Sequence, residues 1–248
     1  MIRMKKDLIE WDTKLFHKNV FEIQNTDYFS KPELKEIDES CSIDNAFMSF
    51  IKLNSRDFRK IHYLEELGFN YMESLYELKK EISIKYPDSF YSKHCFLQRL
   101  DYSDQKAVHE ITKIITTTFD TDRYFLDPKL DQKYSGLRYK NWFLNSFDDE
   151  NYLTYVYLSK KNRDIIGFSM IKNESDEMHF MLGGVSEKFK GYGFIVGLLT
   201  DCLNSAFSQG IKVATTSISS HNLDVFNVYI HFGFHLTDEK IVMRKIYE

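Results

Sequence analysis

The chain has 248 residues, of which 43% are hydrophobic and 28% are charged, with 21 Phe and 16 Tyr. This composition is typical of a globular protein with one large core or two smaller ones, and it excludes a disordered chain. The net charge of −4 argues against a nucleic-acid binder. No run of about 18 apolar residues occurs and the start lacks a signal-peptide core, so we expect a cytoplasmic protein without a membrane partner.

The first third of the chain alternates strand-like and helix-like segments. Strands are expected at 20–25, 45–53 and 70–82. One helix begins after Ser30, a suitable N-cap that is followed by Pro32 in the first turn. A second helix begins at Ser55 and ends at Gly68, because glycine adopts the left-handed conformation that terminates helices. The pattern predicts an αβ unit.

Residues 55–80 resemble residues 220–245, since a Ser, a Gly-Phe pair and the strand that follows coincide. The alignment predicts an internal repeat in which the first copy kept the fold and lost the chemistry, because Leu64 lies where the second copy has Tyr229. No glycine turn precedes the first copy. The alternative is that any helix-Gly-strand unit gives such a match.

A break at 86–93, with Pro87 inside it, separates the two parts of the chain. We place the domains at 1–88 and 93–248. The elements expected after the break are a strand at 94–100, helices at 104–119 and 129–146, strands at 151–159, 164–172 and 177–185, a helix at 191–208, a strand at 211–218, a helix at 221–232 and a strand at 239–247 that closes the sheet.

The segment 177–193, EMHFMLGGVSEKFKGYG, joins a strand to a glycine-spaced basic turn that opens a helix. The amides of Gly191 and Gly193 can approach an anion closely, and the helix directs its positive dipole end to the same point. Lys188 and Lys190 add charge. These features predict a phosphate-binding turn, and the alternative is an ordinary strand-to-helix turn with solvated lysines.

The spacing K-x-x-G-x-G after a strand resembles the [QR]-x-x-G-x-[GA] signature of the GCN5-related N-acetyltransferases (GNATs), with Lys188 where that family has Gln or Arg. The resemblance implies an α/β (α+β) fold: a mixed, mostly antiparallel sheet flanked by helices, preceded by a smaller degenerate GNAT-like half-domain. It also implies acetyl-CoA as cosubstrate. Its expected contacts are Leu182, Gly183, Val185, Lys188, Lys190, Gly191, Tyr192, Gly193, Asn222 and Tyr229.

Amide formation from a thioester needs donors for the developing oxyanion and an acid for the departing thiolate. Gly183 and Gly184 interrupt their strand, which we expect to separate it from its neighbour and to free backbone N–H groups. Asn222 and Tyr229 lie seven residues apart, on one helical face. Their pattern N-x₆-Y-x₃-G-F is similar to the last GNAT motif, in which the Tyr is the general acid. The resemblance therefore implies this role for Tyr229, and the alternative is that Tyr229 is a core aromatic.

The sequence leaves three candidates for the general base. Glu177 and His179 share a strand face, and ordered water is the third candidate. No metal is expected. Cys41, Cys95 and Cys202 are too far apart for a zinc or disulfide framework and are interpreted as buried small hydrophobes. His231 and His235 are four residues apart, but Gly233 between them interrupts the helix, which argues against a shared metal-binding face.

The stretch 116–147 resembles F-x-x-[SD]-R-[FY]-x-x-D-[PA] and Y-x-x-W-[IF]-x-N-S of bacterial dTDP-4-amino-4,6-dideoxysugar N-acetyltransferases such as dTDP-fucosamine acetyltransferase. The start is similar to their L-x-W-D-x-x-F-F, with Leu15 where Phe is common. The match is carried by Arg123, Tyr124, Asp127, Tyr139, Trp142, Asn145 and Ser146, of which Arg123, Tyr124, Tyr139 and Asn145 are expected to contact substrate. For Trp142, packing is the preferred interpretation.

The resulting hypothesis is acetyl transfer from acetyl-CoA to the 4-amino group of a dTDP-4-amino-4,6-dideoxyhexose, a nucleotide-sugar substrate, by direct attack. Acetylation of another amine, such as an antibiotic, a polyamine or a protein N-terminus, is the enzyme alternative. A non-catalytic module that binds acetyl-CoA is the alternative of another class. An open sheet edge would allow a homodimer, and the sequence does not decide this.

Overall fold

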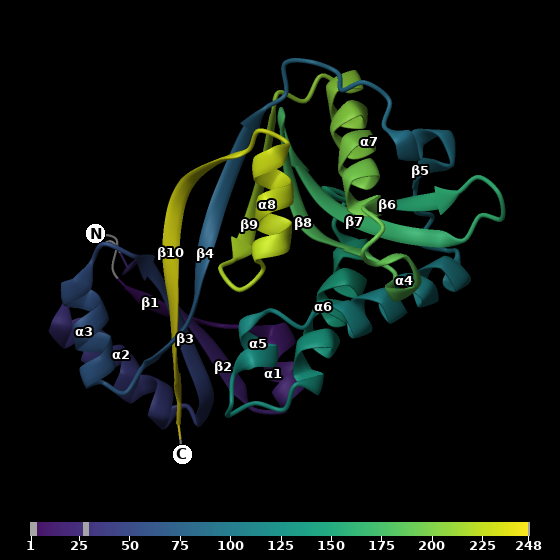
Figure 1. Cartoon of the computed structure of the whole chain (residues 1–248). Helices are drawn as coiled ribbons and strands as arrows, with labels where there is room; N and C mark the ends of the chain where they lie inside the picture. Colours follow the sequence, from purple (N-terminus) through teal and green to yellow (C-terminus); the bar gives the residue numbers. More distant parts are fainter. Residues whose placement is uncertain (1–3, 27–29, 248) are drawn as a thin grey trace.

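In the computed structural model, which describes residues 4–26 and 30–247, the strands of the described chain form one mixed ten-stranded sheet (Figure 1). The strands are β1 (Lys5–Leu8), β2 (Asn19–Gln24), β3 (Ala46–Asn54), β4 (Asn70–Glu81), β5 (Cys95–Arg99), β6 (Tyr152–Ser159), β7 (Ile165–Glu174), β8 (Glu177–Val185), β9 (Val213–Ser219) and β10 (His235–Ile246). Only β2 with β3 and β8 with β9 pair in parallel among them. The expected α/β class with a mostly antiparallel sheet is confirmed.

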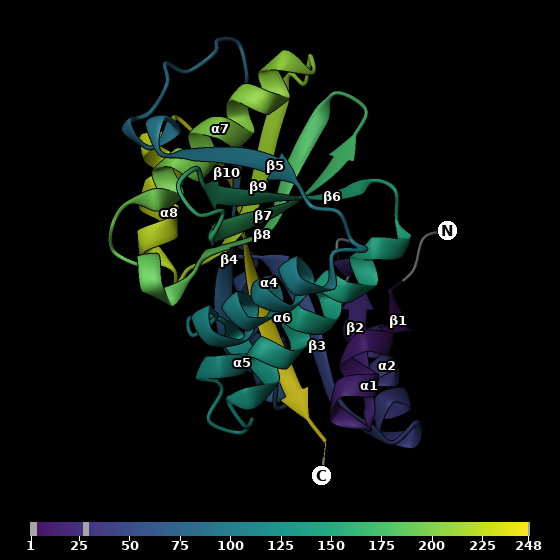
Figure 2. The same cartoon turned by 90° about the vertical axis from the view of Figure 1, so that its right-hand side faces the viewer.

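The helices flank this sheet on both faces. They are α1 (Glu10–Phe16), α2 (Lys31–Ile43), α3 (Phe58–Glu66), α4 (Gln105–Thr118), α5 (Arg123–Leu126), α6 (Lys133–Asn145), α7 (Phe194–Ser208) and α8 (Leu223–His231). In Figure 2, α4 and α6 lie on the opposite side of the strands β6–β8 from α7. Alternate residues of β7 serve both layers: Ile166 faces α7, whereas Phe168 and Met170 face α4 and α6.

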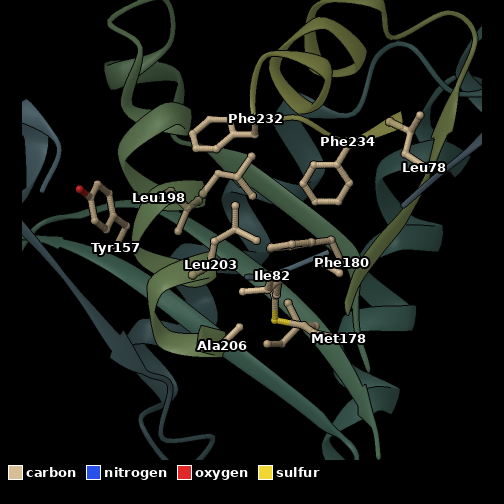
Figure 3. Close-up of a cluster of buried hydrophobic side chains, with 14 of the residues drawn as sticks. Leu78, Ile82, Tyr157, Met178, Phe180, Leu198, Leu203, Ala206, Phe232 and Phe234 are labelled. Carbon is tan, nitrogen blue, oxygen red and sulfur yellow. The ribbon is translucent and has the colours of Figure 1, made fainter. Parts of the chain in front are cut away.

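The core on the α7 side surrounds the strand β8. Figure 3 shows Leu198 and Leu203 of α7 packed with Phe180 of β8, while Phe232 and Phe234 close the cluster from the segment after α8. All five are less than 9% exposed. Burying each such side chain contributes about 1.5–3 kcal/mol relative to exposure, so this cluster fixes α7 and α8 against the strand that forms the site.

The strand order β1-β2-β3-β10-β4-β9-β8-β7-β6-β5 interleaves the two parts of the chain. The last strand, β10, lies between β3 and β4, and β4 in turn pairs with β9 (Figure 1). The sequence analysis predicted that the last strand closes the sheet, and this was wrong: β10 lies in its middle. Each part therefore supplies one long strand to the other.

The registers confirm the predicted repeat. Aligning residue 55 with residue 220 places Leu75 over Lys240 and Asn54 over Ser219. Leu75 pairs directly with Lys240, its own equivalent, in the β4–β10 ladder. The pairs Leu75–Ser219 and Lys240–Asn54 are interchanged by the same alignment. A pseudo-twofold relation thus passes between β4 and β10, and a chance match of helix-Gly-strand patterns would not produce it.

Several expected elements differ at their starts. The helix expected from Ser55 begins at Phe58, because Asp57 is its N-cap and accepts a hydrogen bond from the Lys60 amide at 3.3 Å. Neither α1 nor the short helix α5 was expected. The expected helix at 129–146 is the shorter α6, which begins at Lys133. The helix expected at 191–208 begins at Phe194, since Gly193 is its N-cap.

The first part of the chain has its own apolar clusters. Leu34 of α2 and Leu64 of α3 pack with Ile51 of β3 and with Met243, which comes from β10. All three cysteines are buried and unpaired, as expected. Among the described residues no helix combines the length and apolarity that a bilayer crossing requires, and no group of acidic, His or Cys side chains could hold a metal ion.

Candidate active site

The strands β8 and β9 separate part of the way along their length. They pair in parallel from Glu177 opposite Val213 to Phe180 opposite Thr216, and no further pairs follow although both strands continue. The separation coincides with a bulge at Met181 in the β7–β8 ladder, which skips this residue. Beyond Phe180, backbone groups of β8 therefore face the gap without a ladder partner in β9.

The separation was predicted, but its cause was assigned to the wrong residues. Gly183 and Gly184 remain paired with Ser169 and Phe168 of β7. The strand leaves β9 before either glycine. A bulge cannot be read from alternation alone, because Met181 is as apolar as its neighbours.

A cleft of about 590 Å³ opens where the two strands separate. Its walls come from β3, β4 and the strands β6 to β9, and from the helical segments α5 to α8. It brings together the following residues of the sequence analysis: Arg123, Tyr139, Trp142, His179, Leu182, Gly183, Asn222 and Tyr229. The candidate acid and three side chains that carry the dideoxysugar-like match, those of Arg123, Tyr139 and Trp142, therefore line the same cavity.

Tyr229 is held in this cleft by two aromatic rings. Its ring makes edge contacts with Phe180, at 5.7 Å between centroids, and with Phe234, at 4.9 Å. Burial raises the pKa of Tyr229 well above its ordinary value of 10. The phenol therefore keeps its proton at neutral pH, as a general acid must.

Asn222 is partly buried and is the N-cap of α8. Its side-chain oxygen caps the helix by accepting a hydrogen bond from the Val225 amide at 3.3 Å. The residue also lines the cleft. Its placement is explained by capping, which fixes α8 and with it Tyr229.

The two candidate bases are placed differently. His179 lines the cleft, and its Nδ1 is hydrogen-bonded to Oγ1 of Thr215 on β9. Its Nε2 lies 3.7 Å from a carboxylate oxygen of Glu174. Glu177 is half-buried, pairs with Lys79 at 3.9 Å and is not among the residues that line the cleft. The geometry brings only His179 to the cavity.

The glycine turn has the backbone that an anion site needs. Gly191 and Gly193 have φ of +81° and +75°, and Gly193 is the N-cap of the 15-residue helix α7. Nothing lies within 4 Å of the place where a Cβ of Gly191 would be. The turn is braced by Tyr91, whose hydroxyl donates to the Tyr192 carbonyl at 2.7 Å.

The side chains around this turn are solvent-facing. Lys188 pairs with Asp164 at 3.1 Å and Lys190 with Glu187 at 3.8 Å, both side chains being more than half exposed. Such exposed pairs are weak and can yield to a stronger anion. Open glycine amides at a helix N-terminus with two exposed lysines nearby could hold the diphosphate of acetyl-CoA. Val185 ends β8 ahead of this turn.

The residues of the dideoxysugar-like stretch divide into two groups. Tyr139 lines the cleft and stacks on Phe119, with 4.6 Å between ring centroids. Trp142 lies beside Tyr139 at 6.3 Å and also lines the cleft. Asn145 is exposed at the end of α6, and Tyr124 is fully buried; neither lines the cleft.

The motif residues outside the cleft hold the helices in place. The Tyr124 hydroxyl donates to Asp12 at 2.8 Å, and the same carboxylate accepts from Arg138 at 2.9 Å. Asp12 belongs to the W-D start of the chain, so this motif joins α1 to α6. Asp127 binds Arg244 of β10 through two hydrogen bonds, at 2.7 and 2.6 Å.

Sequence reasoning missed the contribution of the first part of the chain. Glu73, Leu75 and Glu77 lie on one face of β4 and line the cleft, as does Lys52 of β3. Arg123, expected to contact substrate, is itself paired with Glu73 at 2.5 Å. The alternation of the three residues in β4 was visible, but nothing in the sequence indicated that β4 lies next to β9.

No family model matches the chain. It is 22% identical over 228 residues to the spore coat polysaccharide biosynthesis protein SpsD of Bacillus subtilis (strain 168), across 90% of this chain and 76% of SpsD. A GCN5-related N-acetyltransferase from Sphaerobacter thermophilus superposes with a TM-score of 0.67 at 10% identity, over 97% of this chain and 76% of its own.

A tandem GNAT protein from the clavulanic acid biosynthesis pathway gives a TM-score of 0.61 at 8% identity, over 92% of this chain and 75% of its own. At sequence identities this low, the superpositions establish the fold of this chain and not its activity. Because the superpositions extend over nearly the whole chain, the protein has the fold of the GCN5-related N-acetyltransferases.

Proposed function

We propose that the protein is an N-acetyltransferase that transfers the acetyl group of acetyl-CoA to the 4-amino group of a dTDP-4-amino-4,6-dideoxyhexose. One observation carries the proposal: a single cleft is lined by Tyr229 and the free edge of β8 and also by Arg123, Tyr139 and Trp142 of the dideoxysugar-like stretch. The likeness to a protein of spore coat polysaccharide biosynthesis supports a sugar acceptor.

Acetyl-CoA supplies an activated acetyl thioester, and the residues of the chain have three tasks toward it. Backbone N–H groups of β8 beyond Phe180, free of β9, polarise the thioester carbonyl. Tyr229 donates its proton to the departing thiolate. His179 accepts the proton of the attacking amine through a water molecule, and its bond to Thr215 orients the ring for this. Glu177 is the less favoured base because it lies outside the cleft.

Direct attack by the amine is favoured over a covalent acetyl-enzyme. None of the three cysteines lines the cleft, and burial raises the pKa of the Cys202 thiol. A buried thiol with a raised pKa is a poor nucleophile at neutral pH. Tyr139 and Trp142 offer flat aromatic surfaces on which a sugar ring or a thymine can pack.

The test is an acetyl-CoA assay with a panel of amines, which includes dTDP-4-amino-4,6-dideoxygalactose, its glucose epimer, polyamines and peptides. We expect thiol release with a dTDP-sugar. In Tyr229→Phe, kcat should fall about 10²- to 10⁴-fold while the KM for acetyl-CoA stays nearly constant, because the acid acts only in the chemical step. Tyr71→Phe, an exposed tyrosine on β4, is the matched control.

Two other results would change the conclusion. Release with polyamines or peptides alone would exclude the sugar acceptor and leave the transferase. Acetyl-CoA binding measured by calorimetry, with no amine acetylated, would indicate a binding module instead of an enzyme.

A further inference from the structure

One carboxylate oxygen of Glu73 lacks a hydrogen-bond partner in the described part of the chain. Its side chain is 2% exposed. One oxygen, Oε1, pairs with Nη1 of Arg123 at 2.5 Å. The other, Oε2, is buried and has no hydrogen-bond partner among the described residues. Burying an unpaired carboxylate oxygen costs free energy, so such an atom is retained where a partner from outside the chain completes it.

Glu73 forms part of the wall of the cleft. The β4–β9 ladder begins at Leu75 opposite Ser219, so Glu73 lies beyond the last residue of β9. Glu73 and Leu75 are two residues apart on the same strand face, and both line the cavity that contains Tyr229 and Tyr139. A molecule in that cavity lies beside the Glu73 side chain, and contact with the buried Oε2 requires a rotation of that side chain.

The charge of the site decides what kind of group fits. Glu73 and Arg123 together carry no net charge, so the pair attracts a cationic ammonium group only weakly. The remaining oxygen is still a strong acceptor for a neutral O–H donor. The position of Arg123 is further stabilised by cation–π contacts, because its guanidinium lies over the rings of Phe50 and Tyr124, at 5.4 and 5.1 Å.

We infer that Glu73 accepts a hydrogen bond from a ring hydroxyl of the acceptor sugar and thereby selects and orients the acceptor. The inference rests on the proposed function. It gives the first part of the chain, which lacks an equivalent of Tyr229, a direct part in the active site. Arg123 is then a positioning residue that holds the Glu73 carboxylate.

The experiment combines one substitution with a series of acceptors. Steady-state constants are measured for the wild type and for Glu73→Gln with the amino sugar nucleotide that the wild type acetylates, and with analogues that each lack one ring hydroxyl. Glu81→Gln, the same change at an exposed position of β4, is the control. We expect Glu73→Gln to raise the acceptor KM about 10- to 100-fold with little change in the KM for acetyl-CoA.

The analogues identify the partner of Glu73. One deoxy analogue should lose about 10- to 100-fold in kcat/KM with the wild type but less than about 3-fold with Glu73→Gln. Equal losses in both proteins, or no loss with any analogue, would overturn the inference. A Glu73→Gln protein with unchanged KM but a lowered kcat and an altered acid limb of the pH profile would also overturn it, since Glu73 would then move a proton.

Failure of this inference is distinguishable from failure of the proposed function. If the wild type acetylates no amino sugar, the proposed function fails. If it does so and the deoxy analogues are all used equally, only the role of Glu73 fails. The wild-type analogue series needs no variant, so it tests the inference even if Glu73→Gln does not fold, which thermal melting will report.

Discussion

At the scale of single residues, burial decides which side chain can do which chemistry. Tyr229 sits against Phe180 and Phe234, and the resulting rise in its pKa keeps it protonated. His179 remains beside a hydroxyl, that of Thr215, and lines the same cavity. The two groups are therefore suited to opposite proton transfers.

The raised pKa of Tyr229 predicts the pH dependence of the chemical step. A general acid works only while it is protonated, so kcat should show no alkaline loss from this group until the pH exceeds its ordinary pKa of 10. The check is kcat for the best amine from about pH 7 to 10.5, corrected for thioester hydrolysis. An alkaline limb centred below pH 10 that vanishes in Tyr229→Phe would contradict the assignment.

Among the residues expected at the site, two that carry a local sequence signal do line the cleft. Asn222 and Tyr229 share a helix, and a spacing of seven residues places them together without any knowledge of the tertiary structure. Tyr124 and Asn145 matched the same kind of pattern, yet one is buried beneath the helices and the other faces solvent. A motif residue that positions a helix cannot be separated from one that touches substrate until the packing is known.

At the scale of elements, the turn before α7 is the most demanding local structure. Gly193 has φ of +75°, and a Cβ there would collide with the Tyr91 hydroxyl. Gly193→Ala therefore combines backbone strain with a steric clash, and both displace the amides that we propose as the binding site of the diphosphate. We expect the dissociation constant of acetyl-CoA to rise at least about tenfold, as measured by calorimetry.

Gly210 provides the matched control for this prediction. It has φ of +77°, follows the same helix at its other end, and has no atom within 4 Å of a Cβ. Gly210→Ala should cost about 1 kcal/mol of unfolding free energy and leave acetyl-CoA affinity unchanged. Adding Tyr91→Phe to Gly193→Ala removes the clash and should restore part of the affinity. If both glycine variants bind acetyl-CoA as the wild type does, the turn is not the diphosphate site.

Most elements were predictable because their periodicity is strong, and the exceptions have physical causes. The helix α1 has seven residues and a start without a side-chain cap, so its signal is weak. The helix α5 has four residues and depends on Asp122, which accepts from the Tyr124 amide at 2.6 Å. The position of β10 was not predictable, because alternation indicates a strand and not its neighbours.

At the scale of the whole molecule, the two parts of the chain are joined because β10 pairs with β3 and β4, and β4 pairs with β9. Met243 of β10 is fully buried in the cluster that α2 and α3 form. We propose that the division into 1–88 and 93–248 marks the two copies of the repeat and not two units that fold separately. Each copy would lose a central strand if it stood alone.

Unfolding should consequently be a single transition. Trp11 in α1 and Trp142 in α6 are the two tryptophans, so Trp142→Phe and Trp11→Phe leave one reporter in each part. Urea midpoints followed by fluorescence should coincide. Met243→Ala should lower the free energy of unfolding by about 2–4 kcal/mol at both reporters, because it leaves a cavity in the first part. A shift seen by Trp11 alone would mean that the parts unfold independently.

The position of β10 also sets when the protein can fold during its synthesis. The ribosome makes the chain from the N-terminus, and β3 and β4 emerge long before the strand that must lie between them. Until the last residues of β10 leave the exit tunnel, the backbone N–H and C=O groups of β3 and β4 that pair with β10 stay without these partners. The sheet can therefore be completed only after β10 has been synthesised, and nascent chains of this protein are expected to depend on chaperones that bind exposed strand edges.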